Sequence, residues 1–288
     1  MPTTEQLLAG ITSGDKDARF EAWRGAGDAS ADAIPQLAKL AGGSDPGVAK
    51  AAREAITTMV HAVGKDPADP RRAPLVQQLL AAVEGDAPLA GKIHVLRQLS
   101  GIAPEDSSAR VAKLLLNAEL REEALYCLER TPGAAPVKSL VAAYRAAAAE
   151  FKPRLLAALG HRRAEEGVAL CVDAMRSNNA ELATAGANAF GRIGRKPGGQ
   201  FRFPDGGAMS DAQLRYADAL RDQGNHVDAM RIYKAALERA EPHLQCAGIV
   251  GISKMRTADA AAAIFPKLQS KDRTVSTTAI QAWHRLVG

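Results

Sequence analysis

The sequence predicts an all-α protein, an α-α superhelix or solenoid in which helix pairs stack one after another. Small and apolar residues return along the 288 residues at an interval of about thirty-one positions. That interval suits one helix pair with its links. Within each interval the small residues recur at spacings that share one face of a helix. Aromatic residues make up only 4% of an alanine-rich composition, so we expect no sheet of any size.

Nine anchor positions define the interval, and only Gln213 among them is polar. The anchors are Ala18, Val48, Leu89, Leu120, Phe151, Leu182, Gln213, Leu244 and Val275. Their successive spacings are 30, 41 and then 31 throughout. About nine units therefore account for the whole chain, and a core that grows linearly allows one continuous array over residues 1–288.

Two further columns of small or apolar residues accompany the anchors. Four residues after each anchor stand Ala22, Ala52, Ile93, Ala124, Leu155, Gly186, Ala217, Gly248 and Ala279. Seven residues after each anchor stand Gly25, Ala55, Leu96, Cys127, Ala158, Ala189, Leu220, Gly251 and Ala282. Because these positions lie on one helix face, each unit carries a helix whose buried stripe is narrow enough for a close neighbour.

The second unit shows the helix pair most fully. Its first helix is predicted from Ile34, Pro35, Leu37 and Leu40, and its second from Pro46, Val48, Ala51, Ala52, Ala55 and Ile56. Asp45 is placed to cap the second helix, and Pro46 suits the first helical position. Asp86 and Pro88 are expected to repeat this arrangement ahead of Leu89. In these features the chain resembles the HEAT-repeat family, which implies antiparallel HEAT-like helix pairs stacked into a superhelix.

The pattern changes character over residues 210–240. There Ala217, Leu220, Gly224, Ala229, Tyr233 and Ala236 resemble a tetratricopeptide (TPR) helix pair, with Gly224 at the turn. Because this pair keeps the thirty-one-residue register, we interpret it as one more pair inside the same array. An ordinary helical hairpin is the alternative.

Two irregular segments interrupt the repeats. Residues 65–74 contain three prolines and are expected to form a plain spacer that explains the 41-residue interval. Residues 195–209, here called the glycine-rich segment, stand between helical units. Arg192, Arg195, Lys196 and Arg202 flank Phe201 and Phe203 there, and we select these six residues as candidate partner-binding residues. The alternative is that Phe201 and Phe203 tuck over a neighbouring helix in place of a missing first helix.

Charge is unevenly distributed along the chain. Residues 1–144 carry 16 Lys and Arg against 18 Asp and Glu, whereas residues 145–288 carry 21 against 14, which gives the second half a net charge of +7. The first residues lack the pattern of a signal peptide, and no stretch is long and apolar enough to span a membrane. A cytoplasmic location follows, unless the chain is a fragment of a secreted precursor.

Motifs for catalysis, metals and cofactors are missing from the sequence. The three cysteines have no metal-binding or redox spacing, and none of the six histidines is followed by the glutamate of the iron-binding His-Glu pairs found in some HEAT-like enzymes. No nucleophile or nucleotide motif occurs either. We therefore expect a non-enzymatic protein without cofactor or metal.

Three hypotheses about function follow. The favoured one is a scaffold or adaptor that binds a protein or peptide on the solenoid surface. Nucleic-acid binding through the basic second half is the first alternative. The second alternative is an enzyme resembling the HEAT-like bilin lyases or DNA glycosylases, which rests on analogy of fold. Glycosylases of that kind need aromatic groups in their groove, but Trp23 and Trp283 both occupy positions typical of packing.

Overall fold

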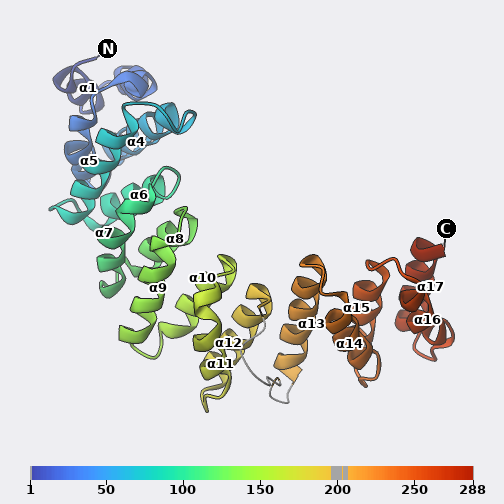
Figure 1. Ribbon diagram of the computed structural model, residues 1–288. Coiled ribbons are helices and arrows are strands. Elements are labelled where there is room, and N and C mark those ends of the chain that lie inside the picture. The colour runs from blue at the N-terminus through green and yellow to red at the C-terminus, as the bar shows by residue number, and fades with distance from the viewer. Residues whose placement is uncertain (1, 196–202, 204–206, 288) are drawn as a thin grey trace. The chain divides into compact units, whose positions relative to one another are not determined.

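The computed structural model describes residues 2–195, 203 and 207–287. It divides into two compact units, Met1–Arg145 and Ala146–Gly288, which are considered one at a time (Figure 1). The described residues form seventeen α-helices, some short 3-10 segments and no strand. The predicted all-α class is therefore confirmed for the described part of the chain, while the single continuous array stays a prediction.

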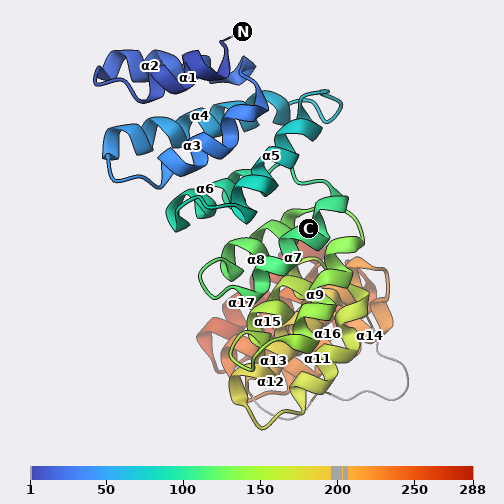
Figure 2. The ribbon, with the colours of Figure 1, turned by 90° about the vertical axis from the view of Figure 1, so that its left-hand side faces the viewer.

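The first unit is built from helix pairs that follow one another in layers. Figure 2 shows the pairs α1–α2, α3–α4 and α5–α6 stacked in this way. The helices are α1 (Thr4–Ile11), α2 (Lys16–Arg24), α3 (Ile34–Ala41), α4 (Pro46–Gly64), α5 (Arg72–Glu84), α6 (Leu89–Leu99), α7 (Ser108–Lys113), α8 (Arg121–Arg130) and α9 (Ala135–Ala146). Short 3-10 segments cover Gly25–Asp28, Ala31–Ala33, Glu105–Ser107 and Leu114–Leu116.

The second unit continues with α10 (Lys152–His161), α11 (Val168–Met175), α12 (Ala180–Ile193), α13 (Gly207–Asp222), α14 (His226–Leu237), α15 (Pro242–Ser253), α16 (Ala258–Ile264) and α17 (Arg273–Val287). Short 3-10 segments cover Glu165–Gly167 and Phe265–Gln269. We call α10, α12, α13, α15 and α17 the anchor helices of this unit, because each carries or directly follows an anchor. The helices α11, α14 and α16 are its cover helices. Each anchor helix packs against the next one along the chain.

The small-residue columns form the packed stripe that the sequence predicts. All eighteen column residues are buried except Ala22 and Ile93, which are half-buried, and Gly25, which is exposed. Close approaches occur at the column glycines Gly186, Gly248 and Gly251 and also at Gly160, which stands outside the columns. A Cβ built on Gly160 of α10 would lie 2.8 Å from the Cα of Ala189 on α12. The anchor helices are therefore close enough that side chains beyond a hydrogen or methyl group do not fit at such points.

Helix starts follow the predicted capping chemistry in one place and depart from it in another. The Asp45 carboxylate accepts the backbone N–H groups of Gly47 and Val48 at 2.8 and 3.0 Å, and Pro46 occupies the first position of α4. Asp86 does not repeat this cap. Its carboxylate instead pairs with the Lys39 ammonium at 2.9 Å, and no side chain caps the start of α6. The extra residue between Asp86 and Leu89 separates the carboxylate from the helix start.

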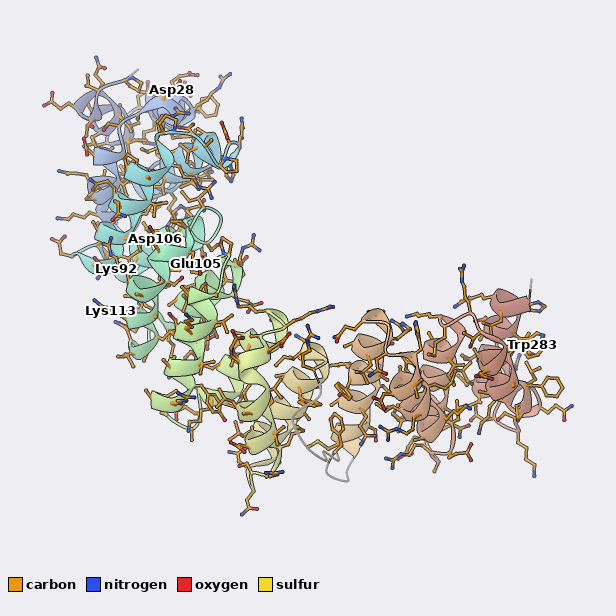
Figure 3. All side chains as sticks on the ribbon, in the orientation of Figure 1. Asp28, Lys92, Glu105, Asp106, Lys113 and Trp283 are labelled. Carbon is orange, nitrogen blue, oxygen red and sulfur yellow. The ribbon has the colours of Figure 1, made fainter. Side chains whose placement is uncertain are left out.

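A carboxylate from a distant position caps α9 instead. The side chain of Glu105, labelled in Figure 3, accepts the backbone N–H groups of Ala134 and Ala135, each at 2.7 Å. These groups lie at the start of α9, where the helix leaves backbone donors without an internal partner. A cap supplied from 29 residues away is invisible to local sequence patterns.

The 41-residue interval is explained mainly by a longer helix. α4 spans 19 residues and runs on to Gly64. The prediction of a plain loop over residues 65–74 is wrong at its end, because residues 72–74 form the first turn of α5. Pro74 is the third residue of α5, where its missing N–H would have no helical partner in any case.

His94 of α6 gives the first unit a titratable group in a half-buried place. Its Nε2 lies 3.0 Å from the backbone carbonyl of Arg53 and donates to it. Burial holds the pKa of His94 below its ordinary value of 6.5, although this hydrogen bond opposes the shift. The folded state therefore binds a proton less readily than the unfolded state.

Stability of the first unit is expected to fall as the pH drops below about 6.5, because the unfolded chain takes up the proton that folded His94 resists. His94→Gln keeps an N–H donor for the Arg53 carbonyl but does not titrate. Between about pH 7.5 and 5.5 the wild type should lose more free energy of unfolding in urea titrations than this variant does. His61→Gln, at an exposed position, is the control and should behave as wild type. If the wild type and His94→Gln lose the same free energy of unfolding over this pH range, His94 is not the group responsible.

The three cysteines differ in accessibility. Cys127 and Cys171 are fully buried, and Cys246 is half-buried. Burial raises the pKa of each of the two buried thiols to about 12. The thiolate is the reactive form, so the native protein is expected to react with iodoacetamide first at Cys246 and at the other two only after unfolding. Peptide mass spectrometry after short labelling checks this, and early modification of Cys127 would contradict it.

Candidate functional site

The six candidate partner-binding residues have different surroundings. Lys196, Phe201 and Arg202 lie outside the described residues. Arg192 lies in the last turn of α12, and Gly194, with a left-handed φ of 69°, follows the end of that helix. Arg195 follows, and its Nε lies 2.6 Å from a carboxylate oxygen of Glu165. Both partners of that ion pair are more than half exposed, so it adds little to stability.

Phe203 is used in the packing of the second unit. Its ring lies 5.3 Å from that of Phe190, nearly perpendicular to it, and 5.9 Å from that of Tyr216. Phe190 and Tyr216 are buried residues of α12 and α13. The aromatic ring thus covers the two anchor helices where other repeats place a cover helix. The segment is also shorter than predicted, because residues 207–209 belong to α13 and Met209 is buried.

A groove lies over the anchor helices of the second unit. It follows α10 and α12 and reaches α13, with a volume of about 640 Å³. Small and apolar residues line much of it: Pro153, Ala157, Ala180, Ala185 and Ala189. A smaller recess of about 340 Å³ adjoins it and shares His161, Arg192 and Arg215 with it.

Three arginines and one glutamate give the groove its charge, namely Arg154, Arg192, Arg215 and Glu181. Arg215 of α13 donates from its guanidinium to the amide oxygen of Asn188 at 2.9 Å, a neutral partner. Within the described residues, neither Arg192 nor Arg215 forms an ion pair with a carboxylate. A Cβ on Gly191 would lie 3.2 Å from the Cβ of Arg215, so the glycine makes room for the arginine stem. The close α12–α13 contact therefore places both guanidinium groups at one groove.

The two acidic residues at the recess share one arginine, whose single positive charge balances one of their two negative charges. Arg221 pairs with Asp218 at 2.6 Å and with Asp222 at 2.7 Å. The buried Tyr233 donates its hydroxyl to Asp218 at 2.7 Å. Burial, and then this hydrogen bond, raise the pKa of Tyr233 far above its ordinary value, so the hydroxyl stays a donor. Arg221, with a side chain only 12% exposed, holds both carboxylates, and within the described residues neither of them pairs with Arg192 or Arg215.

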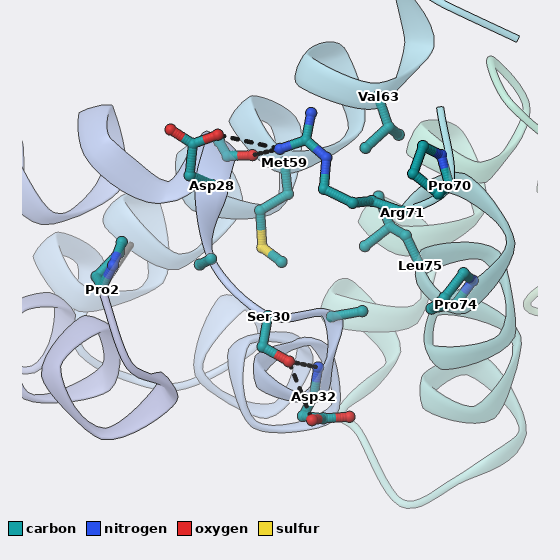
Figure 4. Close-up of a pocket in the computed structure, with 13 residues that line it drawn as sticks. Pro2, Asp28, Ser30, Asp32, Met59, Val63, Pro70, Arg71, Pro74 and Leu75 are labelled. Carbon is teal, nitrogen blue, oxygen red and sulfur yellow. Dashed lines mark hydrogen bonds and ion pairs between the residues drawn. The ribbon is translucent and has the colours of Figure 1, made fainter. Parts of the chain in front are cut away.

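A second pocket, in the first unit, has the opposite character. It encloses about 520 Å³ between the 3-10 segments, α4 and α5, and Met59, Val63 and Leu75 line it (Figure 4). The Arg71 guanidinium at its edge bonds to Asp69 at 2.7 Å, to Asp28 at 3.0 Å and to the Gly27 carbonyl. The hydrogen bond from Arg71 holds the pKa of Asp69 below its ordinary value. Because its one arginine is paired internally, this pocket offers no free cation from the described residues, and we interpret it as a joint between helix pairs.

Most residues of the groove were missed by sequence reasoning, which selected only Arg192. One signal was present. Ten residues after the last six of the nine anchors stand Arg130, His161, Arg192, Gln223, Lys254 and Arg285. Basic residues therefore recur near the carboxyl ends of anchor helices, where they also interact favourably with the helix dipole. Arg215 carries no such signal, because its place depends on the close contact at Gly191.

The comparisons with known proteins support the fold. No family model and no curated protein matches the chain. The structure resembles Kap95p, solved bound to RanGDP, with a TM-score of 0.51 at 13% identity over 98% of this chain and 43% of Kap95p. Kap121p bound to Nup53p gives a TM-score of 0.47 at 12% identity, covering 98% of this chain and 33% of Kap121p. An engineered protein gives 0.40 at 18% identity, covering 98% and 88%.

The chain thus spans less than half the length of the two natural neighbours. The likeness to Kap95p shows that the fold is a helical repeat solenoid. None of the described helices has both the length and the apolar character needed to cross a bilayer.

Proposed function

We propose that this protein is a non-enzymatic scaffold that binds a partner protein on the anchor helices of its second unit. The observation that carries the proposal is the groove over α10, α12 and α13, in which Arg192 and Arg215 have no carboxylate partner among the described residues. Cations without a carboxylate partner beside an apolar surface are typical of a protein–protein interface, in which the partner supplies the opposite charge. That Kap95p was solved bound to another protein is consistent with this use of a helical repeat.

Blocking the groove tests the proposal. Ala185 lies in the groove on α12 and is half-buried, so Ala185→Trp would fill the groove without opening the core. Ala235→Trp, on an exposed position of cover helix α14, is the matched control. Far-UV circular dichroism should show the same helix content in both variants and the wild type.

The expected result is a partner that copurifies with the wild type and with Ala235→Trp and is lost with Ala185→Trp. Photo-crosslinking from Thr184, also in the groove, should then join that same partner covalently. A partner retained equally by both tryptophan variants would place binding elsewhere on the molecule and reject this surface.

A further inference from the structure

We infer that the groove over α10, α12 and α13 recognises an acidic peptide segment of its partner. This inference rests on the proposed function and adds the chemistry of what is bound. Its basis is charge complementarity: the guanidinium groups of Arg192 and Arg215 face one groove and have no carboxylate partner in the described part of the chain. Carboxylates are the peptide groups that match the fork of donors on arginine.

The acids beside the groove are paired with an arginine of their own. Asp218 and Asp222 stand next to Arg215 at the recess, and free carboxylates there would compete with an acidic ligand. Arg221 lowers this competition, because its charge balances one of the two carboxylates and it pairs with both from a largely buried position. Tyr233 adds a further donor to Asp218. Arg192, which is half-buried, and Arg215, which is exposed, form no ion pair within the described residues and keep their charge for a ligand.

The shape of the groove suits a peptide. Alanines of α10 and α12 form its floor, so a peptide main chain and small side chains can approach closely. Asn188 and Thr184 supply polar groups beside this floor. Arg215 is held toward the groove by its hydrogen bond with Asn188, which lowers the entropy lost when a ligand binds.

Nucleic acid fits the same surface less well. Single strands are held by stacking on exposed aromatic rings together with a continuous row of cations. The groove has no aromatic lining residue, and Phe203 is packed against Phe190 and Tyr216. Trp23 and Trp283 each pack beside a phenylalanine, Phe20 and Phe265 respectively.

The test measures the affinity of fluorescein-labelled octaglutamate by fluorescence anisotropy. Octaglutamine and oligothymidylate with the same dye serve as the other probes. The groove variant carries Arg192→Glu and Arg215→Glu. The matched control carries Arg176→Glu and Arg239→Glu, two exposed positions at the ends of cover helices, and changes the net charge by the same amount. If the groove variant does not fold, Arg192→Gln with Arg215→Gln replaces it.

The groove variant is expected to raise the Kd of octaglutamate about tenfold or more, whereas the control variant changes it about twofold. Octaglutamine should bind neither protein. Equal losses in the two variants would reveal a response to net charge alone and overturn the inference. Oligothymidylate that binds more tightly than octaglutamate, and is lost in the groove variant, would overturn it in favour of nucleic acid.

The inference and the proposed function can fail separately. If Ala185→Trp loses a partner protein but octaglutamate does not bind the wild type, the scaffold stands and the acidic ligand is wrong. If octaglutamate binds through Arg192 and Arg215 while Ala185→Trp keeps every partner, the groove binds anions and is not the scaffold's docking surface.

Discussion

Replacing Phe190 by alanine is expected to lower the free energy of unfolding of the second unit by about 3–5 kcal/mol. Phe190 is fully buried, and its ring contacts the rings of Phe203 and Tyr216 at 5.3 and 5.0 Å. Removing the ring leaves a cavity. Within the described residues no cover helix lies between α12 and α13 that could move in to fill it. Urea unfolding followed by far-UV circular dichroism measures the loss.

Phe20→Ala is the matched control for this variant. Phe20 is also aromatic and contacts Trp23 edge-on, but it is 44% exposed, so its loss should cost within about 1 kcal/mol. Phe203→Ala gives a second check, since its effect should not add fully to that of Phe190→Ala once the shared contact is gone. Full additivity would show that Phe203 does not pack on Phe190 in solution.

Gly186→Leu is the second large expected effect, with a loss of about 3 kcal/mol. A Cβ on Gly186 would lie 2.8 Å from both the carbonyl oxygen of Cys171 and the Cβ of Ala174, and 3.1 Å from the backbone N of Met175. Two of these atoms are backbone of cover helix α11, so the clash cannot be relieved by a rotamer change. α11 and α12 would have to separate, which exposes the core between them.

Gly25→Leu provides the comparison for Gly186→Leu. Gly25 is exposed, its φ of −82° suits any residue, and a Cβ there meets nothing within 4 Å. Its thermal midpoint should stay near that of the wild type, while that of Gly186→Leu falls clearly. If both variants melt alike, the α11–α12 approach is looser than the structure shows.

The fold was predictable because its determinants are local and repeated. Each anchor helix must present small residues at the same positions to its neighbours. The columns that contain Ala52 and Ala55 repeat because of this requirement, so they can be read from the sequence. Capping by Asp45 was predictable for the same reason, since the cap and the capped N–H groups lie within three residues. Asp86 stands further from the start of its helix than Asp45 does, and its side chain caps no backbone N–H group there.

The groove could be predicted only in part, because it depends on contacts between helices. Arg192 was selected for its place beside the glycine-rich segment, whereas the structure associates it with Arg215 through the α12–α13 contact at Gly191. The hydrogen bond from Tyr233 to Asp218 also requires the folded arrangement of α13 and α14. The pairing of Arg221 with Asp218 is local, since the two residues are three apart on α13, and that spacing could have been used.

The anchors Leu182 and Gln213 are 31 residues apart, as their neighbours are, although glycines and prolines occupy the stretch between α12 and α13. The interval from Leu182 to Gln213 therefore has the same number of residues as the intervals that contain a cover helix. Substitutions alone could have rewritten it, with no gain or loss of residues, and every later anchor would have kept its count. Among homologous chains, we expect amino-acid substitutions to be more frequent in the cover helices than in the anchor helices.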